Sequence, residues 1–236
     1  MPKTFKHSGD LGDIIFSLPA IRALGGGILY LDPEGGLSNP LVTSYGKNHT
    51  KINDAIIDSF KPILIRQPYI VDVLPWHGEQ IDHDLDEFRR HIRFNNLSDS
   101  HLAIFGLSFE ERDRAWLTID DPITIPDRPI VISRTPRYHG NDGFWVTALP
   151  RIKDRCVFLG FPKEHEMFVY TFDEEVTYYP TADILTLARV IAGAEQFIGN
   201  QGFIHSLAEA MKKDLINETD RCYPAAMFQR KGAQYV

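Results

Sequence analysis

Residues suited to acid–base and anion chemistry gather in the segment KHSGDLGDIIFSLPAIRAL, which covers residues 6–24. Gly9 and Gly12 allow the backbone to turn tightly and to approach a ligand closely. Asp10 and Asp13 place two carboxylates at the same point, and one of them could accept a proton from an attacking hydroxyl group. A helix that begins near Asp13 would also present free N–H groups, which suit anions. The simpler alternative is that Asp13 only caps this helix.

A second segment of this kind, IGNQGFIHSLAEAM, covers residues 198–211. A short apolar strand is followed by a polar turn, and a helix is expected to begin near Phe203. Gln201 and His205 could contact a phosphate or a ribose at the start of that helix. The alternative for His205 is a side chain satisfied within the first helical turn, and for Gly202 a residue that only fits the turn.

Two arginines follow a predicted strand in the segment ISRTPRYHGNDGFW, residues 132–145. The guanidinium groups of Arg134 and Arg137 are suited to bidentate binding of phosphate oxygens. Arginines in a loop are most often only solvated. Their position at the carboxyl end of a strand makes a binding role an equal alternative.

The elements that must position these residues alternate between strand and helix along the chain. Strands are expected at residues 4–7, 28–31, 70–74, 130–133, 156–159, 176–179, 197–198 and 215–216, and helices at 13–24, 52–64, 100–109, 182–194 and 203–211. Pro19 should kink the first helix or shift its start. Thr181 is expected to cap the fourth helix, with Asp183 in its first turn. This alternation is typical of α/β proteins with parallel sheets.

A proline-rich stretch, DDPITIPDRP, divides the chain into two halves, because so many prolines cannot continue a helix or a central strand. We expect Rossmann-like halves over residues 1–120 and 129–213 that face a cleft. A linker is expected at 121–128. Residues 214–236 are expected to form a C-terminal strand and a tail that can cross back.

Composition excludes several classes of protein. Of the 236 residues, 43% are hydrophobic and 24% are charged, which excludes disordered, collagen-like and coiled-coil chains. A net charge of −7 lacks the electrostatic footprint of a general nucleic-acid binder. No secretory signal is visible, nor an apolar run of about 20 residues that could span a membrane, so we expect a cytoplasmic protein.

The sequence predicts neither a metal site nor a disulfide framework. Cys156 and Cys222 form no CxxC pair, which favours a reducing compartment. The histidines include no HExxH motif. The acidic run at residues 82–87 lacks EF-hand spacing, so we interpret it as a solvated edge. A GxSxG motif is absent, which argues against a serine hydrolase.

The two glycine-bearing segments, in this order and separation, resemble the heptosyltransferase-like (family 9) glycosyltransferases of GT-B fold. The N-terminal signature of that family appears here as Lys6, Gly12-Asp13-Ile14-Ile15 and Leu18-Pro19-Ala20-Ile21-Arg22. The C-terminal signature is similar to Gly199-Asn200-Gln201-Gly202-Phe203-Ile204-His205. The chain is far shorter than typical members of that family. It also diverges from the second signature, where Asn200-Gln201 replaces the acid.

The resemblance implies metal-independent transfer of a hexosyl or heptosyl group, with inversion, from a nucleotide sugar to a hydroxyl acceptor. The nucleotide sugar is a co-substrate, and no further cofactor is implied. Asp13 would be the catalytic base, and the loop at the cleft would comprise Ser8, Gly9, Asp10 and Gly12. The donor would be bound by Arg134, Arg137, Gln201, Gly202, Phe203, Ile204, His205 and Glu218.

Two other functions stay open, because a fold does not by itself determine an activity. The chain could be a non-catalytic nucleotide or nucleotide-sugar binding protein of the same fold. It could also be a nucleotide-sugar epimerase. For a transferase, the favoured acceptor is a saccharide; a lipid-linked core, a protein and a modified nucleic-acid base are the alternatives.

Overall fold

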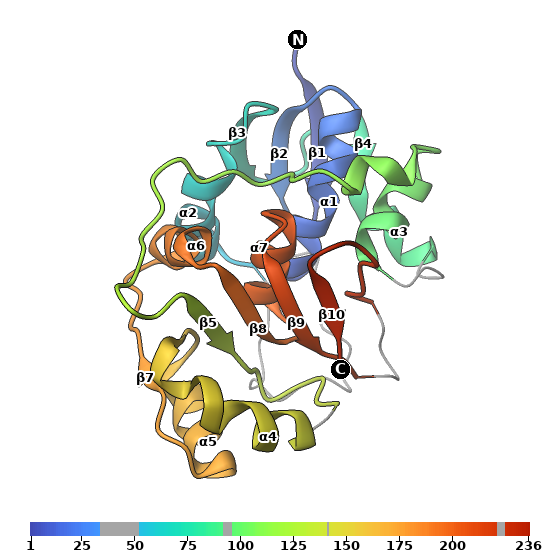
Figure 1. Cartoon of the computed structure of the whole chain (residues 1–236). Coiled ribbons are helices and arrows are strands. Elements are labelled where there is room, and N and C mark those ends of the chain that lie inside the picture. The colour runs from blue at the N-terminus through green and yellow to red at the C-terminus, as the bar shows by residue number, and fades with distance from the viewer. Residues whose placement is uncertain (34–51, 92–95, 141, 221–224) are drawn as a thin grey trace. The chain divides into compact units, whose positions relative to one another are not determined.

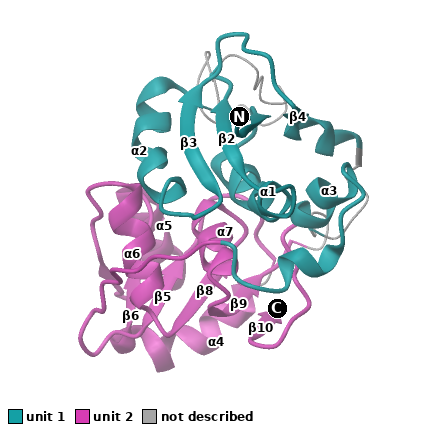
Figure 2. Ribbon diagram, turned by 90° about the horizontal axis from the view of Figure 1, so that it is seen from above, with its two compact units in different colours: residues 1–116 teal, residues 117–236 magenta. Residues whose placement is uncertain are grey.

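Two compact α/β units make up the chain, residues 1–116 and residues 117–236 (Figure 2). The computed structural model describes residues 1–33, 52–91, 96–140, 142–220 and 225–236. Each unit is built on its own all-parallel sheet, which confirms the predicted α/β class. The stretch predicted as a linker belongs to the second unit, where the Ile123 N–H donates to the Arg189 carbonyl at 2.9 Å. The cleft that the sequence predicts stays a prediction.

The first unit holds a four-stranded sheet in the order β3-β2-β1-β4 (Figure 1). Its strands are β1 (Lys3–His7), β2 (Gly27–Leu31), β3 (Ile70–Pro75) and β4 (His83–Asp84). Its helices are α1 (Leu11–Ala23), α2 (Asp54–Leu64), α3 (Leu97–Ala103) and the short 3-10 helices η2 (Leu85–His91) and η3 (Phe109–Arg112). From β1, the chain adds β2 and β3 on one side and later β4 on the other. The strand order therefore reverses between β1 and β4.

Two helices of this unit differ from the prediction. α1 begins at Leu11, with Asp10 at the N-cap, and runs through Pro19 as one helix. α3 begins three residues earlier than predicted, because the side chain of Asn96 accepts the Asp99 N–H at 2.8 Å and caps it. It also ends earlier, before Gly106, whose φ of +63° no helix can continue.

The second unit holds a six-stranded sheet in the order β10-β9-β8-β5-β6-β7. Its strands are β5 (Ile130–Ser133), β6 (Cys156–Phe158), β7 (Thr177–Tyr178), β8 (Gln196–Asn200), β9 (Asp214–Glu218) and β10 (Ala233–Tyr235). Its helices are α4 (Asp142–Ile152), the 3-10 helix η4 (Lys153–Arg155), α5 (Pro162–Phe172), α6 (Ile184–Gly193) and α7 (Phe203–Ala210). Here the strand order reverses between β5 and β8.

Helices cover both faces of the second sheet, with α4 and α5 on one face and α6 and α7 on the other (Figure 1). Trp145, Leu149 and Phe168 pack from α4 and α5 against alternate residues of β5, Ile130 and Ile132. Neither α4 nor α5 was predicted from the sequence. Across the described ranges, no helix is long and apolar enough to cross a membrane.

The cap of α6 corrects a detail of the prediction. Asp183, not Thr181, is the N-cap residue, and its carboxylate accepts the Thr186 N–H at 2.6 Å. A carboxylate at this position both pairs an N–H that the helix leaves unpaired and favours the helix dipole.

Candidate active site

The proposed base, Asp13, lies at the reversal of strand order in the first unit, where ligands of parallel α/β sheets bind. It is the third residue of α1 and is half-buried. Asp10 occupies the N-cap, so Asp13 is not simply the cap of this helix. Its carboxylate packs against the backbone of Gly9, where an added methyl group would lie 2.9 Å from Asp13 Oδ2.

The loop between β1 and α1 uses its own backbone N–H groups internally. The Ser8 N–H donates to Asp86 Oδ1 at 3.0 Å, and the Gly9 N–H donates to His7 Nδ1 at 2.8 Å. Neither group is therefore available to an anion, although the sequence suggested that this loop approaches a ligand with its backbone. The Gly9 backbone of this loop packs against Asp13, and the role of the loop at a cleft stays a prediction.

Asp86 departs from the interpretation of the acidic run at residues 82–87 as a solvated edge, whereas Asp82 in the same run is exposed. The Asp86 side chain is 16% exposed and accepts from Lys6 Nζ at 3.1 Å as well as from the loop. Burial would raise the pKa of Asp86, but the hydrogen bonds from Arg89 and the Ser8 N–H lower it, and this pKa lies well below its ordinary range. Asp86 is thus a permanent anion beneath the loop.

Lys6 also binds a group of carboxylates. Its Nζ lies 3.6 Å from Asp32 and 3.8 Å from Asp84, and 4.9 Å from the centre of the Trp76 ring. Burial would lower the pKa of Lys6, but the hydrogen bond and charge of Asp86, with the other two carboxylates, raise it. Lys6 is therefore a fixed cation that joins β1 to β2 and β4.

Three strand ends bring the predicted donor-binding residues together in the second unit. In the parallel register, Ser133 at the end of β5 lies opposite Gly199 of β8, and Asn200 lies opposite Glu218 of β9. The residues that follow β5 and β8 therefore meet at the point where the strand order reverses. Donor binding by these residues, which the family resemblance implies, stays a prediction.

Arg134 and Glu218 bind each other. Arg134 Nε donates to Glu218 Oε2 at 2.7 Å, and Nη2 donates to Oε1 at 2.8 Å. Both side chains are almost fully buried. Burial would raise the pKa of Glu218, but Arg134 and the Trp145 indole N–H lower it to about 2. The direct donor contacts expected of these two residues stay predictions, and the structure gives the pair a role in shaping the loop.

Asn200, at the end of β8, holds the loop after β5 through side-chain hydrogen bonds. In the sequence it stands out only as a departure from the family signature. Its Oδ1 accepts the Thr135 N–H at 2.9 Å, and its Nδ2 donates to the carbonyls of Thr135 at 3.0 Å and Arg137 at 2.5 Å. Only an amide can both donate and accept in this way. Within this loop, Tyr138 has a φ of +59°, a left-handed conformation that a non-glycine residue adopts only when its surroundings enforce it.

Arg137 differs from Arg134 because no carboxylate of the described residues neutralises its charge. Its guanidinium lies 5.3 Å from the centre of the Tyr138 ring and makes no ion pair with any residue in the described ranges. The start of α7 lies beside the same loop, since a methyl group on Gly202 would lie 3.0 Å from Thr135 Cγ2. Gly202 is the N-cap of α7 and offers no side chain to cap it.

The remaining predicted donor-binding residues differ in exposure. Gly202 and Phe203 are half-buried, whereas Gln201, Ile204 and His205 are buried. The His205 ring is 1% exposed and lies 6.1 Å from the Phe197 ring. Burial, together with the charge of Arg230, lowers the pKa of His205 to about 3. His205 is therefore a neutral core residue in this structure.

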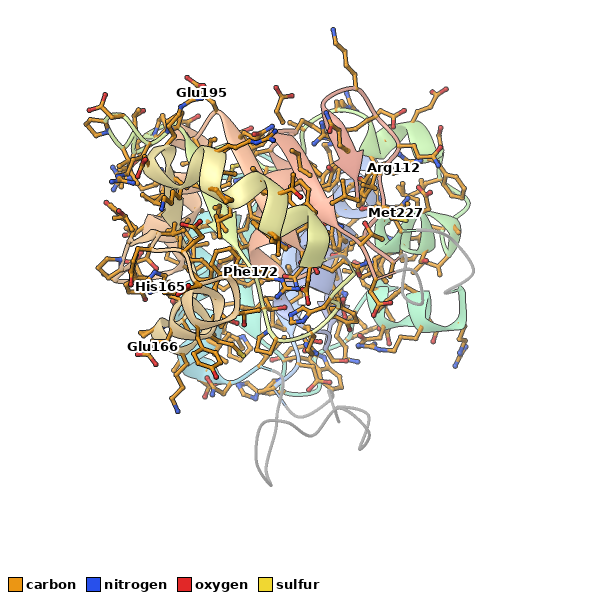
Figure 3. The ribbon with its side chains drawn as sticks, turned by 60° about the horizontal axis from the view of Figure 1, so that its bottom comes forward. Arg112, His165, Glu166, Phe172, Glu195 and Met227 are labelled. Carbon is orange, nitrogen blue, oxygen red and sulfur yellow. The ribbon has the colours of Figure 1, made fainter. Side chains whose placement is uncertain are left out.

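A pocket of about 110 Å³ opens beside the loop after β5. Loop residues and the side of α5 form its walls, which comprise Arg134, Thr135, Pro136, His139, Asp142, Glu164, Met167, Phe168 and Thr171. Figure 3 shows Phe172 on the inner side of α5 and Glu166 on its outer edge. The Arg134 guanidinium lies 5.1 Å from the Phe172 ring. In the parts of the chain that the structure describes, no three acidic, histidine or cysteine side chains could hold a metal ion.

Comparison with known proteins gives matches in structure alone. No protein-family model matches the chain, and no curated protein matches it in sequence. The structure of E. coli heptosyltransferase WaaC with ADP-2-deoxy-2-fluoro heptose matches 100% of this chain and 93% of its own, with a TM-score of 0.58 and 14% identity. The fold is that of the heptosyltransferases.

Other glycosyltransferases share this heptosyltransferase-like fold. A family 9 glycosyl transferase from Veillonella parvula DSM 2008 gives a TM-score of 0.61 at 12% identity, over 99% of this chain and 86% of its own. The iron-containing dodecameric glycosyltransferase TibC from enterotoxigenic E. coli gives a TM-score of 0.53 at 16% identity, over 92% of this chain and 57% of its own. The predicted resemblance thus holds at the level of the fold.

Proposed function

We propose that this chain is a glycosyltransferase that moves a hexosyl or heptosyl group from a nucleotide-sugar donor to a hydroxyl acceptor. The transfer inverts the anomeric centre and needs neither a metal ion nor a further cofactor. The observation that carries this proposal is the position of Asp13, a half-buried carboxylate supported on a braced loop at the reversal of strand order.

The proposed reaction is a single displacement. Asp13 accepts the proton of the acceptor hydroxyl as its oxygen bonds to the anomeric carbon. The bond from that carbon to the donor phosphate breaks, and its electron pair leaves with the nucleoside diphosphate. A general base at this position typically accelerates such a step by about 10²–10⁴-fold.

The second unit is proposed to bind the donor. Arg137, whose charge is not paired within the described residues, would bind the diphosphate. The start of α7 lies next to the same loop and would add backbone N–H groups and the positive end of the helix dipole. Both features stabilise the negative charge that develops on the leaving diphosphate.

The pocket beside the loop suits the nucleoside part of the donor. Its walls combine apolar surface from Pro136, Met167 and Phe168 with polar groups of Thr135 and Thr171. Arg134 lines this pocket, and Glu218 holds Arg134 in place through a hydrogen bond. We therefore propose that the pair determines the shape of the donor site.

Release of nucleoside diphosphate tests the proposal. The full chain is incubated in EDTA with ADP-, UDP- and GDP-activated hexoses and heptoses and a panel of saccharide acceptors. We expect turnover with at least one donor and an inverted anomeric configuration in the product by NMR. Asp13→Asn should reduce turnover at least about 100-fold while leaving nucleoside diphosphate affinity unchanged. Asp58→Asn, at an exposed residue of α2, is the matched control.

Other outcomes separate the alternatives. Binding of a nucleoside diphosphate without turnover of any donor would favour a non-catalytic binding protein. Conversion of the donor sugar without an acceptor would indicate an epimerase. We propose a saccharide acceptor and a cytoplasmic location, which acceptor screening and cell fractionation would test.

A further inference from the structure

Two buried histidines connect the support of Asp13 to the core of the first unit. His7 ends β1 and His101 lies on α3, and neither ring is exposed to solvent. Their Nε2 atoms lie 3.1 Å apart. On the outer sides, His101 Nδ1 lies 2.7 Å from the Leu97 carbonyl, and His7 Nδ1 accepts the Gly9 N–H at 2.8 Å.

These contacts fit a single arrangement of protons. The Leu97 carbonyl can only accept, so His101 carries its proton on Nδ1, and its Nε2 is an acceptor. His7 must then donate from Nε2, which leaves its Nδ1 as the acceptor of the Gly9 N–H. Both rings are therefore neutral. Burial agrees with this arrangement, because it lowers the pKa of His101 to about 3.

The pair reaches Asp13 through Gly9. A methyl group on Gly9 would lie 2.4 Å from His7 Cε1 and 2.9 Å from both Cβ and Oδ2 of Asp13. The ring and the carboxylate therefore both pack on the side of Gly9 where a side chain would project. The position of the Gly9 backbone thus sets how closely the loop packs against both groups.

We propose that His7 and His101 are positioning residues that hold the β1–α1 loop, and with it the Asp13 carboxylate, through a proton arrangement that exists only while both rings are neutral. The proposal rests on the proposed role of Asp13 as the base. The pair itself does not touch substrate, and it acts through the Gly9 N–H. Neither His7 nor His101 was predicted from the sequence as part of the site.

Charged groups around the pair set its response to acid. Asp86 Oδ1 lies 3.7 Å from His7 Nδ1, and Arg89 of the same helix binds Asp86. Further charged groups on the neighbouring elements are Lys6 of β1 and Asp13 of α1. On α3, Asp99 forms an ion pair with Arg112 of η3 at 2.5 Å. A second proton on His7 would face the Gly9 N–H, and the ring would turn toward Asp86. Acid would therefore release the loop.

Substitutions at His7 test the arrangement. In His7→Asn, the amide oxygen lies near the place of Nδ1 and still accepts the Gly9 N–H, whereas His7→Leu has no acceptor. We expect His7→Leu to lower kcat at least about 10-fold with the KM for the donor unchanged, and His7→Asn to recover most of the loss. His77→Asn, at an exposed histidine of the same unit, should match the wild type across the pH profile.

NMR of the full chain provides a test that does not need turnover. At pH 7, long-range ¹H–¹⁵N spectra should show a proton on Nδ1 of His101 and on Nε2 of His7. His7→Leu should shift the Gly9 amide and the Asp13 carboxyl ¹³C signals, and His7→Asn should shift both less. Either ring as a cation or in the other tautomer, or unchanged Gly9 and Asp13 signals in His7→Leu, would overturn the proposal. Absence of turnover in the wild type, with these signals as expected, would overturn the proposed function alone.

Discussion

Arg134 and Glu218 form a buried ion pair across the ends of β5 and β9, two strands that β8 separates. The Gly140 N–H and the Trp145 indole N–H also donate to Glu218, at 2.8 and 2.7 Å. Each carboxylate oxygen therefore receives two donors. The pair fixes both ends of the loop at residues 134–140, on which the proposed donor site depends.

Glu218→Gln should destabilise the protein. It leaves the buried Arg134 guanidinium with only the exposed carboxylate of Asp142 as a countercharge. Removal of the buried partner of such a pair typically costs about 3–5 kcal/mol. Urea unfolding at pH 7 measures the change. Glu174→Gln, which breaks a more exposed pair with Lys153, is the matched control and should cost less than about 1 kcal/mol. Equal losses in the two variants would contradict the structural role of the buried pair.

Arg137→Ala should weaken nucleoside diphosphate binding about 10- to 100-fold without changing the thermal midpoint. The physical reason is the loss of a charge that no described residue pairs, so the fold does not depend on it. Isothermal titration calorimetry with ADP, UDP and GDP measures the affinity. Arg151→Ala, at an exposed position of α4, is the control. An unchanged affinity in Arg137→Ala would remove this residue from the donor site.

Gly9→Ala should reduce turnover at least about 10-fold while nucleotide affinity is retained. The added methyl group would overlap His7 Cε1 at 2.4 Å, and it would push the loop away from the ring or the Asp13 carboxylate out of place. Steady-state kinetics and calorimetry on the same sample separate the two effects. Wild-type kcat in this variant would show that the position of Asp13 tolerates displacement of the loop.

Stability should fall as the pH falls below about 6.5. Burial lowers the pKa of His101 and His205 to about 3 in the folded protein, so between these values the unfolded chain binds more protons. The slope reaches about 1.4 kcal/mol per pH unit for each histidine. Urea unfolding from pH 7 to pH 4.5 measures it. His205→Gln should flatten the slope, whereas His139→Gln, at an exposed residue, should not.

Sequence patterns predicted the elements whose signals are local. The strand of β5 and the strand–turn–helix that leads into α7 follow from apolar runs with glycine and polar turns, and both lie where predicted. α4 and α5 were missed because Pro150 lies inside one and aromatic residues fill the other, so neither shows a clean amphipathic pattern.

Contacts between distant residues could not be predicted. Glu218 is 84 positions from Arg134, and His101 is 94 positions from His7, so no spacing reveals either pair. The alternation of strands and helices did predict the parallel sheet in which β5 and β8 are neighbours. It could not show that Arg134 forms an ion pair with Glu218, whereas Arg137 forms none with any described residue. That difference depends on the carboxylate at the end of β9.

The internal use of the Ser8 and Gly9 amides has a consequence for engineering. The Ser8 and Gly9 amides are already hydrogen-bonded within the unit, so we expect donor choice to depend on other parts of the chain. In the proposed reaction, it is encoded in the segment from Arg134 to Gly140 and the turn that Asn200 clamps to it. A chimera that exchanges only these two segments with those of another such enzyme would acquire new donor selectivity while keeping the original proton acceptor.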